Sequence, residues 1–161
     1  LSNAGRSSLL ASITNAKPKI ANYQVTTLNP NLGVASYDDK EITIADIPGL
    51  IEGAHEGTGL GIQFLKHIER CKTLLHLIDI TNNDLEKAYY QVKNELKSYN
   101  PDLLKKKELI VLNKIDLIDK ELGKEIANDF SKKISEEVLT LSTLEKNSVS
   151  QIKARLISYV T

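Results

Sequence analysis

The 161-residue sequence contains no methionine, no tryptophan and a single cysteine, Cys71. One cysteine excludes an internal disulfide and fits a reducing compartment. Neither sign of charge is in excess, because 21 lysines and arginines face 21 aspartates and glutamates. Bulk electrostatics therefore favour neither DNA nor a membrane surface as a partner. The longest apolar runs, 74–80 and 109–112, are too short to span a bilayer, and no signal-peptide pattern is visible.

The length suits one ordinary domain with a sizeable core. We interpret residues 1–161 as a single α/β unit, because no internal repeat, low-complexity tract or linker interrupts them. The chain begins with Leu1 and has no Met, so its translation start is not present and we expect a fragment of a longer protein.

Short apolar runs alternate with longer helical periods, which is typical of a parallel sheet with crossover helices. Three such runs predict strands that are covered on both faces. They lie at 74–78, 109–112 and 138–141. Residues 41–44 alternate in polarity and predict a strand nearer an edge, with 32–37 as its antiparallel neighbour and 38–40 as the turn.

Apolar residues at steps of three and four predict three amphipathic helices. Asn83 with Glu86 is expected to cap the first, which ends before Pro101, and a capping box over Ser148–Gln151 is expected to open the last. The apolar positions are Leu85, Ala88, Tyr89, Val92 and Leu96, then Leu122, Ile126 and Phe130, and finally Val149, Ile152, Leu156 and Val160.

The chain opens with a polar segment, Asn3–Ser8, ahead of helical residues. It matches the second half of the phosphate loop G-x-x-x-x-G-K-[ST], with Gly5 as the second glycine and Ser7 as the hydroxyl. Backbone N–H groups at a helix start can wrap phosphates, and a serine hydroxyl there can ligate Mg²⁺. Arg6 stands in the place of the lysine and keeps its charge in a planar fork. Taken alone, this half-motif is better explained by an ordinary capped helix start.

The segment Asp46-Ile47-Pro48-Gly49 follows the strand predicted at 41–44. An Asp that closes a strand can hold Mg²⁺ through water, and the N–H of the following Gly can meet a γ-phosphate. Asp, Pro and Gly are also common in a simple turn at a strand end. Both readings stay open for this motif alone.

The sharpest motif is Asn113-Lys114-Ile115-Asp116, directly after the apolar run 109–112. Ligands of parallel sheets sit outside the carboxyl ends of the strands. The Asp116 carboxylate can there accept both hydrogens of the guanine N1/N2 edge, a pair that adenine cannot supply. Asn113 would tie neighbouring loops together, and the Lys114 stem can lie over the base. A chance polar turn is the alternative.

A softer motif, Ser142-Thr143-Leu144, follows the last predicted strand. Its backbone N–H groups could meet the guanine O6, although a purely structural loop fits equally well. The order of the motifs carries more weight than any one of them. The phosphate loop, D-x-P-G, N-K-x-D and this loop all follow strands in the order and rough spacing that one guanine nucleotide site requires.

With these motifs the chain resembles the GTPase domain of the Obg family of translation-factor-related P-loop GTPases. The resemblance covers essentially all 161 residues, and its longer segments are more diagnostic than N-K-x-D. These segments are 16–21, 26–28, 30–33, 45–55, 57–61 and 67–71. The resemblance implies a P-loop NTPase-type three-layer sandwich, with a mostly parallel sheet and helices on both faces.

The resemblance also implies a GTP/GDP site with bound Mg²⁺. It assigns Ser7, Thr27 and Asp46 to the metal, and gives Arg6, Thr27 and Gly49 catalytic roles. The nucleotide would be bound by Asn3, Ala4, Gly5, Arg6, Ser7, Ser8, Asp46, Gly49, Asn113, Lys114, Asp116, Ser142, Thr143 and Leu144.

The chain departs from the family pattern at Ser2 and Arg6, which replace Pro and Lys, and at Thr143, which replaces Ala. The strand before the phosphate loop, central to the sheet in the family, is missing, as is the family's N-terminal glycine-rich domain. We therefore expect lowered stability, weak nucleotide binding, and a groove between the strands at 43–47 and 74–78.

Leu50 stands where many GTPases carry the glutamine that orients the attacking water. A hydrocarbon side chain cannot do this by hydrogen bonding, which predicts a low intrinsic rate and a need for a partner. Asn3 occupies the place of a K⁺ ligand in potassium-dependent relatives. K⁺ is therefore a further candidate cofactor.

Our main interpretation is a GTP hydrolase that acts as a slow molecular switch. The resemblance implies a cytoplasmic setting, assembly of the large ribosomal subunit or contact with its RNA, and links to growth and stress control. The alternative is a guanine-nucleotide-binding interaction module with vestigial hydrolysis, which Arg6, Leu50 and the missing strand favour. A structural α/β domain without nucleotide is disfavoured by the placement of N-K-x-D.

Overall fold

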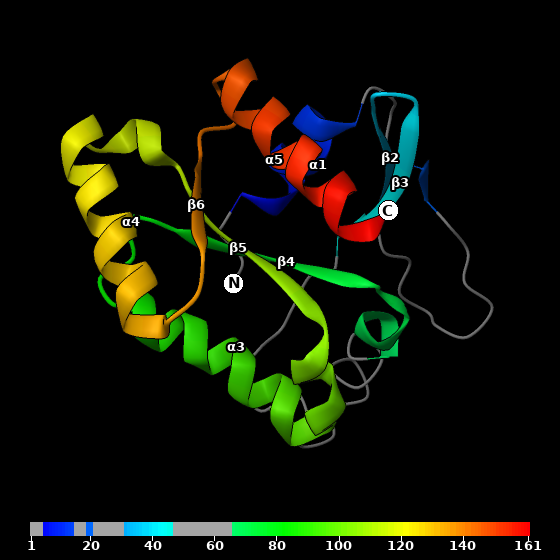
Figure 1. Ribbon diagram of the computed structural model, residues 1–161, viewed down its shortest axis with the longest axis horizontal. Coiled ribbons are helices and arrows are strands. Elements are labelled where there is room, and N and C mark those ends of the chain that lie inside the picture. The colour runs from blue at the N-terminus through cyan, green and yellow to red at the C-terminus, as the bar shows by residue number, and fades with distance from the viewer. Residues whose placement is uncertain (1–4, 15–18, 21–30, 47–65) are drawn as a thin grey trace.

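The strands form two three-stranded sheets in the computed structural model, which describes residues 5–14, 19–20, 31–46 and 66–161 (Figure 1). One sheet has the order β1-β2-β3 and antiparallel pairing, and the other has the order β4-β5-β6 and parallel pairing. The strands are β1 (Lys19–Ile20), β2 (Asn31–Tyr37), β3 (Lys40–Asp46), β4 (Thr73–Asp79), β5 (Lys107–Asn113) and β6 (Val138–Leu141).

The antiparallel hairpin of β2 and β3 confirms the prediction from alternating polarity. Tyr37 pairs with Lys40, and the two residues between them have left-handed backbone, with φ 50° at Asp38 and 59° at Asp39. Positive φ at both central residues matches the right-handed twist of the strands that a tight turn joins, and Asp tolerates it better than most residues. The short polar turn therefore sets the register of the hairpin.

The parallel sheet confirms the three strands predicted from apolar runs. Its central strand, β5, is the most deeply buried, and Val111 and Leu112 are fully enclosed. Strands that are covered on both faces need apolar side chains in both directions, which explains the continuous run. The carboxyl ends of β4 and β5 are in register at Asp79 and Asn113, so the polar residues that follow them emerge side by side.

Helices cover both faces of the parallel sheet and complete the three layers (Figure 1). One core cluster joins α1 and α5 to strands of both sheets, and a second joins α3 and α4 to β4 and β5. The helices are α1 (Arg6–Ile13), α3 (Leu85–Tyr99), α4 (Lys120–Ile134) and α5 (Lys146–Val160), with the 3-10 turns η2 (Pro101–Lys105) and η3 (Ile115–Leu117). Residues 66–70 are also helical.

Three details of the helix predictions are wrong. The N-cap of α3 is Asp84, whose carboxylate accepts from the Lys87 N–H, and not Asn83. The last helix begins earlier than expected, after Glu145, because the Ser148 hydroxyl accepts from a neighbouring loop and does not cap the helix. On α4 the buried stripe runs through Ala127 and Phe130, and Leu122 is exposed.

A groove lies between β3 of one sheet and β4 of the other, as expected from the sequence. Within the described residues each of these strands pairs with one neighbour only. The cavity between them measures about 440 Å³ and is lined by residues of both strands and of four described helices, α1, α3, α5 and the helix at 66–70. Apolar side chains dominate the lining, among them Leu9, Ile13, Ile42, Ile44, Leu77 and Leu96.

A buried polar cluster beneath α3 accounts for the mid-strand histidine. His76 Nδ1 lies 2.8 Å from Glu108 Oε1, and Lys93 Nζ binds the other carboxylate oxygen. Burial by itself raises the pKa of Glu108, but the bonds from His76 and Lys93 outweigh it and hold the pKa below its usual value. The His76 ring also stacks on Tyr89. The His76 Nε2 is buried without a partner in the described part of the chain.

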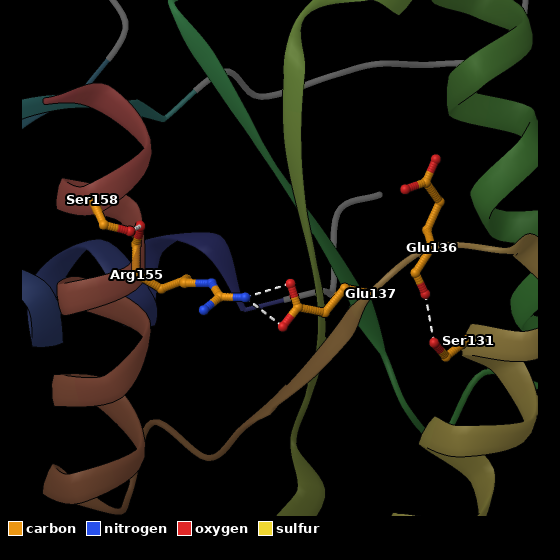
Figure 2. Close-up of polar contacts among 5 residues, drawn as sticks. All are labelled: Ser131, Glu136, Glu137, Arg155 and Ser158. Atoms are coloured by element: carbon orange, nitrogen blue, oxygen red, sulfur yellow. Dashed lines mark hydrogen bonds and ion pairs between the residues drawn. The ribbon is translucent and has the colours of Figure 1, made fainter.

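The strand β6 is tied to α5 by an exposed ion pair. Figure 2 shows the Arg155 guanidinium reaching both carboxylate oxygens of Glu137, the residue before β6. The same view shows the Ser131 hydroxyl donating to the Glu136 carbonyl at the end of α4. These contacts fix the two ends of the segment between α4 and β6.

No helix among the described residues is both long and apolar enough to cross a membrane.

Candidate functional site

The start of α1 lies directly against the end of β5. Gly5 is the N-cap of α1 and has left-handed backbone, with φ 86° and ψ 26°. A Cβ added to Gly5 would lie 2.5 Å from Asn113 Nδ2, closer than atoms can approach. Only glycine allows both this backbone and this contact. The structure therefore brings the predicted phosphate loop and the N-K-x-D motif together.

The loop after β5 holds Lys114 by a defined ion pair. Lys114 has left-handed backbone, with φ 65°, and its Nζ lies 2.7 Å from Asp79 Oδ2 at the end of β4. The other Asp79 oxygen accepts from the N–H and the hydroxyl of Thr81. Burial by itself raises the pKa of Asp79, but the bonds from Lys114 and Thr81 outweigh it and hold the pKa below its usual value. Asp79 thus remains an anion that anchors the Lys114 head group.

Asp79 is a site residue that sequence reasoning missed. The run around it predicts a strand, but an acidic residue at a strand end has no distinctive local signature. Its role depends on the register that sets Asp79 opposite Asn113, next to Lys114. The one available signal was its position at the carboxyl end of a parallel strand, where ligands of such sheets bind.

The loop after β6 contacts Asp116 through Ser142. The fully buried Ser142 hydroxyl donates to Asp116 Oδ1 at 2.7 Å and accepts from the Leu144 N–H at 3.3 Å. The Ser142 N–H is already bound to the Ser148 hydroxyl. In the described part of the chain the Thr143 N–H has no acceptor. The two loops that the sequence predicts to recognise the base are therefore hydrogen-bonded to each other. Within the described residues, the Asp116 carboxylate and the Thr143 N–H can each still form a hydrogen bond with a ligand.

The end of β3 contributes the second charged contact. Arg6, the first residue of α1, points its Nε at Asp46 Oδ1 over 3.1 Å. The Arg6 side chain is 27% exposed and that of Asp46 is 7% exposed. The predicted phosphate ligand and the predicted metal ligand therefore form an ion pair with each other.

The remaining predicted site residues are either exposed or lie outside the described residues. Ser8 lies in α1, is exposed, and its carbonyl accepts from the Ser12 hydroxyl. Leu144 is 80% exposed at the loop after β6. Four of the predicted residues and the Leu50 position lie outside the described residues, as does the side chain of Ser7. The four are Asn3, Ala4, Thr27 and Gly49.

Together these residues form one cluster at the carboxyl ends of β3, β4, β5 and β6. It offers a helix N-terminus, which favours anions, next to a guanidinium. It also offers a carboxylate and a free amide on neighbouring loops, which can bind a planar group with adjacent donors and an acceptor. Such a set can hold a ligand with a phosphate at one end and a purine at the other.

The comparisons with known sequences agree with this chemistry. A sequence model of the family described as 50S ribosome-binding GTPase matches residues 1–114. The GTPase Obg of Pelagibacter ubique is 75% identical over 161 residues, which are 100% of this chain and 49% of that protein. The GTPase Obg of Rickettsia felis is 53% identical over 152 residues, 94% of this chain and 46% of that protein. The chain thus spans about half the length of these relatives.

Solved structures with the same fold are more distant in sequence. The G domain of the T. maritima FeoB iron transporter superposes with a TM-score of 0.73 at 19% identity, over 99% of this chain and 93% of that one. A variant of Aquifex aeolicus Era bound to GDP.AlF4- gives a TM-score of 0.70 at 21% identity, over 98% and 53% of the two chains. At these identities the likeness shows the fold alone. It confirms the predicted G-domain architecture.

Proposed function

The chain belongs to the 50S ribosome-binding GTPase family and, within it, to the Obg GTPases. From this membership we propose that it binds guanine nucleotides and acts as a slow switch, which hydrolyses GTP to GDP and phosphate. The observation that supports this most is the contact between Gly5 and Asn113. It sets a helix N-terminus suited to phosphates beside the loops suited to a guanine base, within one cluster.

In this proposal Asp116 reads the base. One of its oxygens accepts from Ser142, which fixes the carboxylate, and its remaining lone pairs face the N1–H and N2–H of guanine. The Thr143 N–H donates to the guanine O6. Adenine presents the reverse pattern and would leave these buried polar groups unpaired, which costs far more than a lost contact. Asp79 holds the Lys114 head group so that its stem can cover the ring.

The phosphates lie at the start of α1, where the first backbone N–H groups of the helix have no acceptor within the helix. The proposed contacts are the amides of Asn3–Ser8 and the Arg6 guanidinium. Asp46 fits a metal site, because its buried carboxylate already pairs with a cation. Together with the hydroxyls of Ser7 and Thr27 it is the proposed Mg²⁺ site. Bound Mg²⁺ would supply neutralisation of the phosphate charge.

Hydrolysis is proposed to be slow without a partner, because Leu50 cannot orient the attacking water. Arg6, Thr27 and the Gly49 N–H are the proposed stabilisers of the γ-phosphate. The proposed partner is the large ribosomal subunit or its RNA, and the description of the family as ribosome-binding supports it. The proposed location is the cytoplasm, and the proposed role is in the control of growth and stress. K⁺ near Asn3 would act as an additional cation.

A second candidate is a nucleotide-binding module whose hydrolysis is vestigial. The ion pair between Arg6 and Asp46 favours it, because a guanidinium bound to the metal ligand is not positioned to serve a phosphate. Single-turnover GTP hydrolysis with and without large ribosomal subunits separates the two candidates. A rate that rises at least tenfold with subunits supports the switch, whereas GDP binding without any acceleration supports the module.

The binding step has its own test. Fluorescent GDP is titrated and then displaced by GTP, GDP and ATP in Mg²⁺ buffer, once with Na⁺ and once with K⁺. Displacement by GTP and GDP, with ATP weaker by a factor of about 10² or more, is the expected result. ATP competing as well as GTP would remove the guanine assignment. For the K⁺ proposal, single-turnover GTP hydrolysis is measured in both buffers, and equal rates in Na⁺ and K⁺ would remove it.

A further inference from the structure

The ion pair between α1 and β3 joins two residues that the proposed site uses for different ligands. Arg6 Nε is 3.1 Å from Asp46 Oδ1. The Asp46 side chain is only 7% exposed, and it lies at the end of β3. The Asp46 carboxylate is therefore paired with a cationic side chain of the protein itself.

Physical chemistry makes this pair persistent. A buried carboxylate left without a partner is strongly disfavoured, because its desolvation is no longer offset. Any process that takes Arg6 away must therefore supply another cation to Asp46.

The geometry also explains why an arginine differs from a lysine here. The contact is made by Nε, which occupies the place of the Cε methylene in a lysine side chain. A lysine at the same position carries the same charge but has no donor at that atom, and its ammonium lies one bond further out. Arginine is thus bound to the Asp46 carboxylate in a way that lysine cannot reproduce.

We propose that Arg6 is the internal counter-ion of Asp46 in the ligand-free site, and that the nucleotide phosphate must draw Arg6 away before Asp46 is released to a divalent cation. This inference rests on the proposed function and adds an order of events to it. Phosphate and Asp46 compete for one guanidinium, so the carboxylate weakens phosphate binding whenever no metal is present. With the metal bound, Asp46 supports phosphate binding instead.

The test is a double-mutant cycle on GDP affinity, measured by calorimetry in EDTA and repeated in Mg²⁺. Asp46→Asn removes the competitor and is expected to tighten GDP binding in EDTA about fivefold to tenfold. In the Arg6→Lys background the same change should tighten it less than about twofold. In Mg²⁺ the sign reverses, and Asp46→Asn should weaken binding in both backgrounds.

A matched control separates this competition from net charge. Asp129→Asn removes one carboxylate from the exposed surface of α4, far along the chain from the site, and should leave GDP affinity in EDTA unchanged. An equal gain from Asp46→Asn with Arg6 intact and in the Arg6→Lys background, or an equal gain from Asp129→Asn, would overturn the inference. Absence of GDP binding by the unmodified chain in Mg²⁺ would instead overturn the proposed function itself.

A second measurement needs no variant of the buried carboxylate. The Arg6 Nε–H resonance in a ¹⁵N spectrum, assigned through its loss in Arg6→Lys, reports the ion pair directly. Addition of inorganic pyrophosphate in EDTA should shift this resonance, because the guanidinium changes partner. A resonance that stays in place while pyrophosphate saturates the site would contradict the exchange of partners.

Discussion

Replacing Gly5 with alanine tests the contact on which the site depends. Two costs add up in this variant. The left-handed backbone of Gly5, with φ 86°, disfavours an alanine by about 1 kcal/mol. The new Cβ would also meet Asn113 Nδ2 at 2.5 Å, and moving this fully buried amide costs about a further 1–2 kcal/mol. Gly5→Ala should therefore destabilise the fold by about 2–3 kcal/mol.

The measurement is urea unfolding, followed by GDP titration of the folded variant. Gly123→Ala is the matched control, because Gly123 lies in α4 with ordinary helical backbone and its added Cβ would meet only flexible side chains, the nearest being that of Ile115 at 3.0 Å. This control should change stability by less than about 1 kcal/mol and leave GDP binding intact. Adding Asn113→Ala to Gly5→Ala should remove the steric part of the cost but not the backbone part. A stability of Gly5→Ala equal to that of the unmodified chain would refute the reasoning.

Four further variants test other contacts. Asp116→Asn should weaken GDP binding about 30-fold, because one acceptor becomes a donor that faces the donors of guanine. A fluorescence titration of GDP checks this. Asp79→Asn should weaken GDP binding about fivefold, because Lys114 loses the carboxylate that holds it beside the base. The affinity for pyrophosphate should stay unchanged, and calorimetry compares the two ligands. Glu108, with its lowered pKa, contributes stability that is fully present above its ordinary pKa of 4.5 and is lost as pH falls from there through the folded value, so Glu108→Gln should flatten the decline in urea stability below about pH 4.5. Glu137→Gln, at an exposed ion pair, should leave the midpoint of thermal unfolding nearly unchanged.

Much of the architecture follows from the sequence because burial leaves a clear pattern. The apolar run 109–112 of β5 has no polar position that could face solvent, which predicted a strand covered on both faces. The polar run 38–40 before an alternating segment predicted a turn, and Asp38 and Asp39 in it adopt positive φ. In these cases one local property of the chain decides the structure.

The failures occur where several polar residues compete for one role. Asn83 and Asp84 are both good N-caps, and only the path of the chain decides that Asp84 binds the helix end. Ser148 has the sequence of a cap, but its hydroxyl is recruited by the Ser142 N–H of the loop before it. Such choices depend on tertiary contacts, which no local pattern records.

The candidate site was predictable in its motifs but not in its contacts. The position of N-K-x-D after a strand predicted that Asp116 faces a ligand. The sequence also placed the loop of Ser142 at the same site, but it did not predict the hydrogen bond between Ser142 and Asp116. The ion pair of Arg6 with Asp46 and that of Lys114 with Asp79 arise from strand register and helix position. Register is set by the whole sheet, so these partners appear only in three dimensions.

One titration tests most directly whether the start of α1 and the loop after β6 bind a single nucleotide. The ¹⁵N-labelled chain is titrated separately with GDP, pyrophosphate and guanosine in Mg²⁺ buffer, and the backbone amides of Gly5 and Thr143 are followed. We predict that GDP shifts both amides, that pyrophosphate shifts that of Gly5 alone, and that guanosine shifts that of Thr143 alone. Saturation with GDP that leaves either amide unmoved would contradict a shared site.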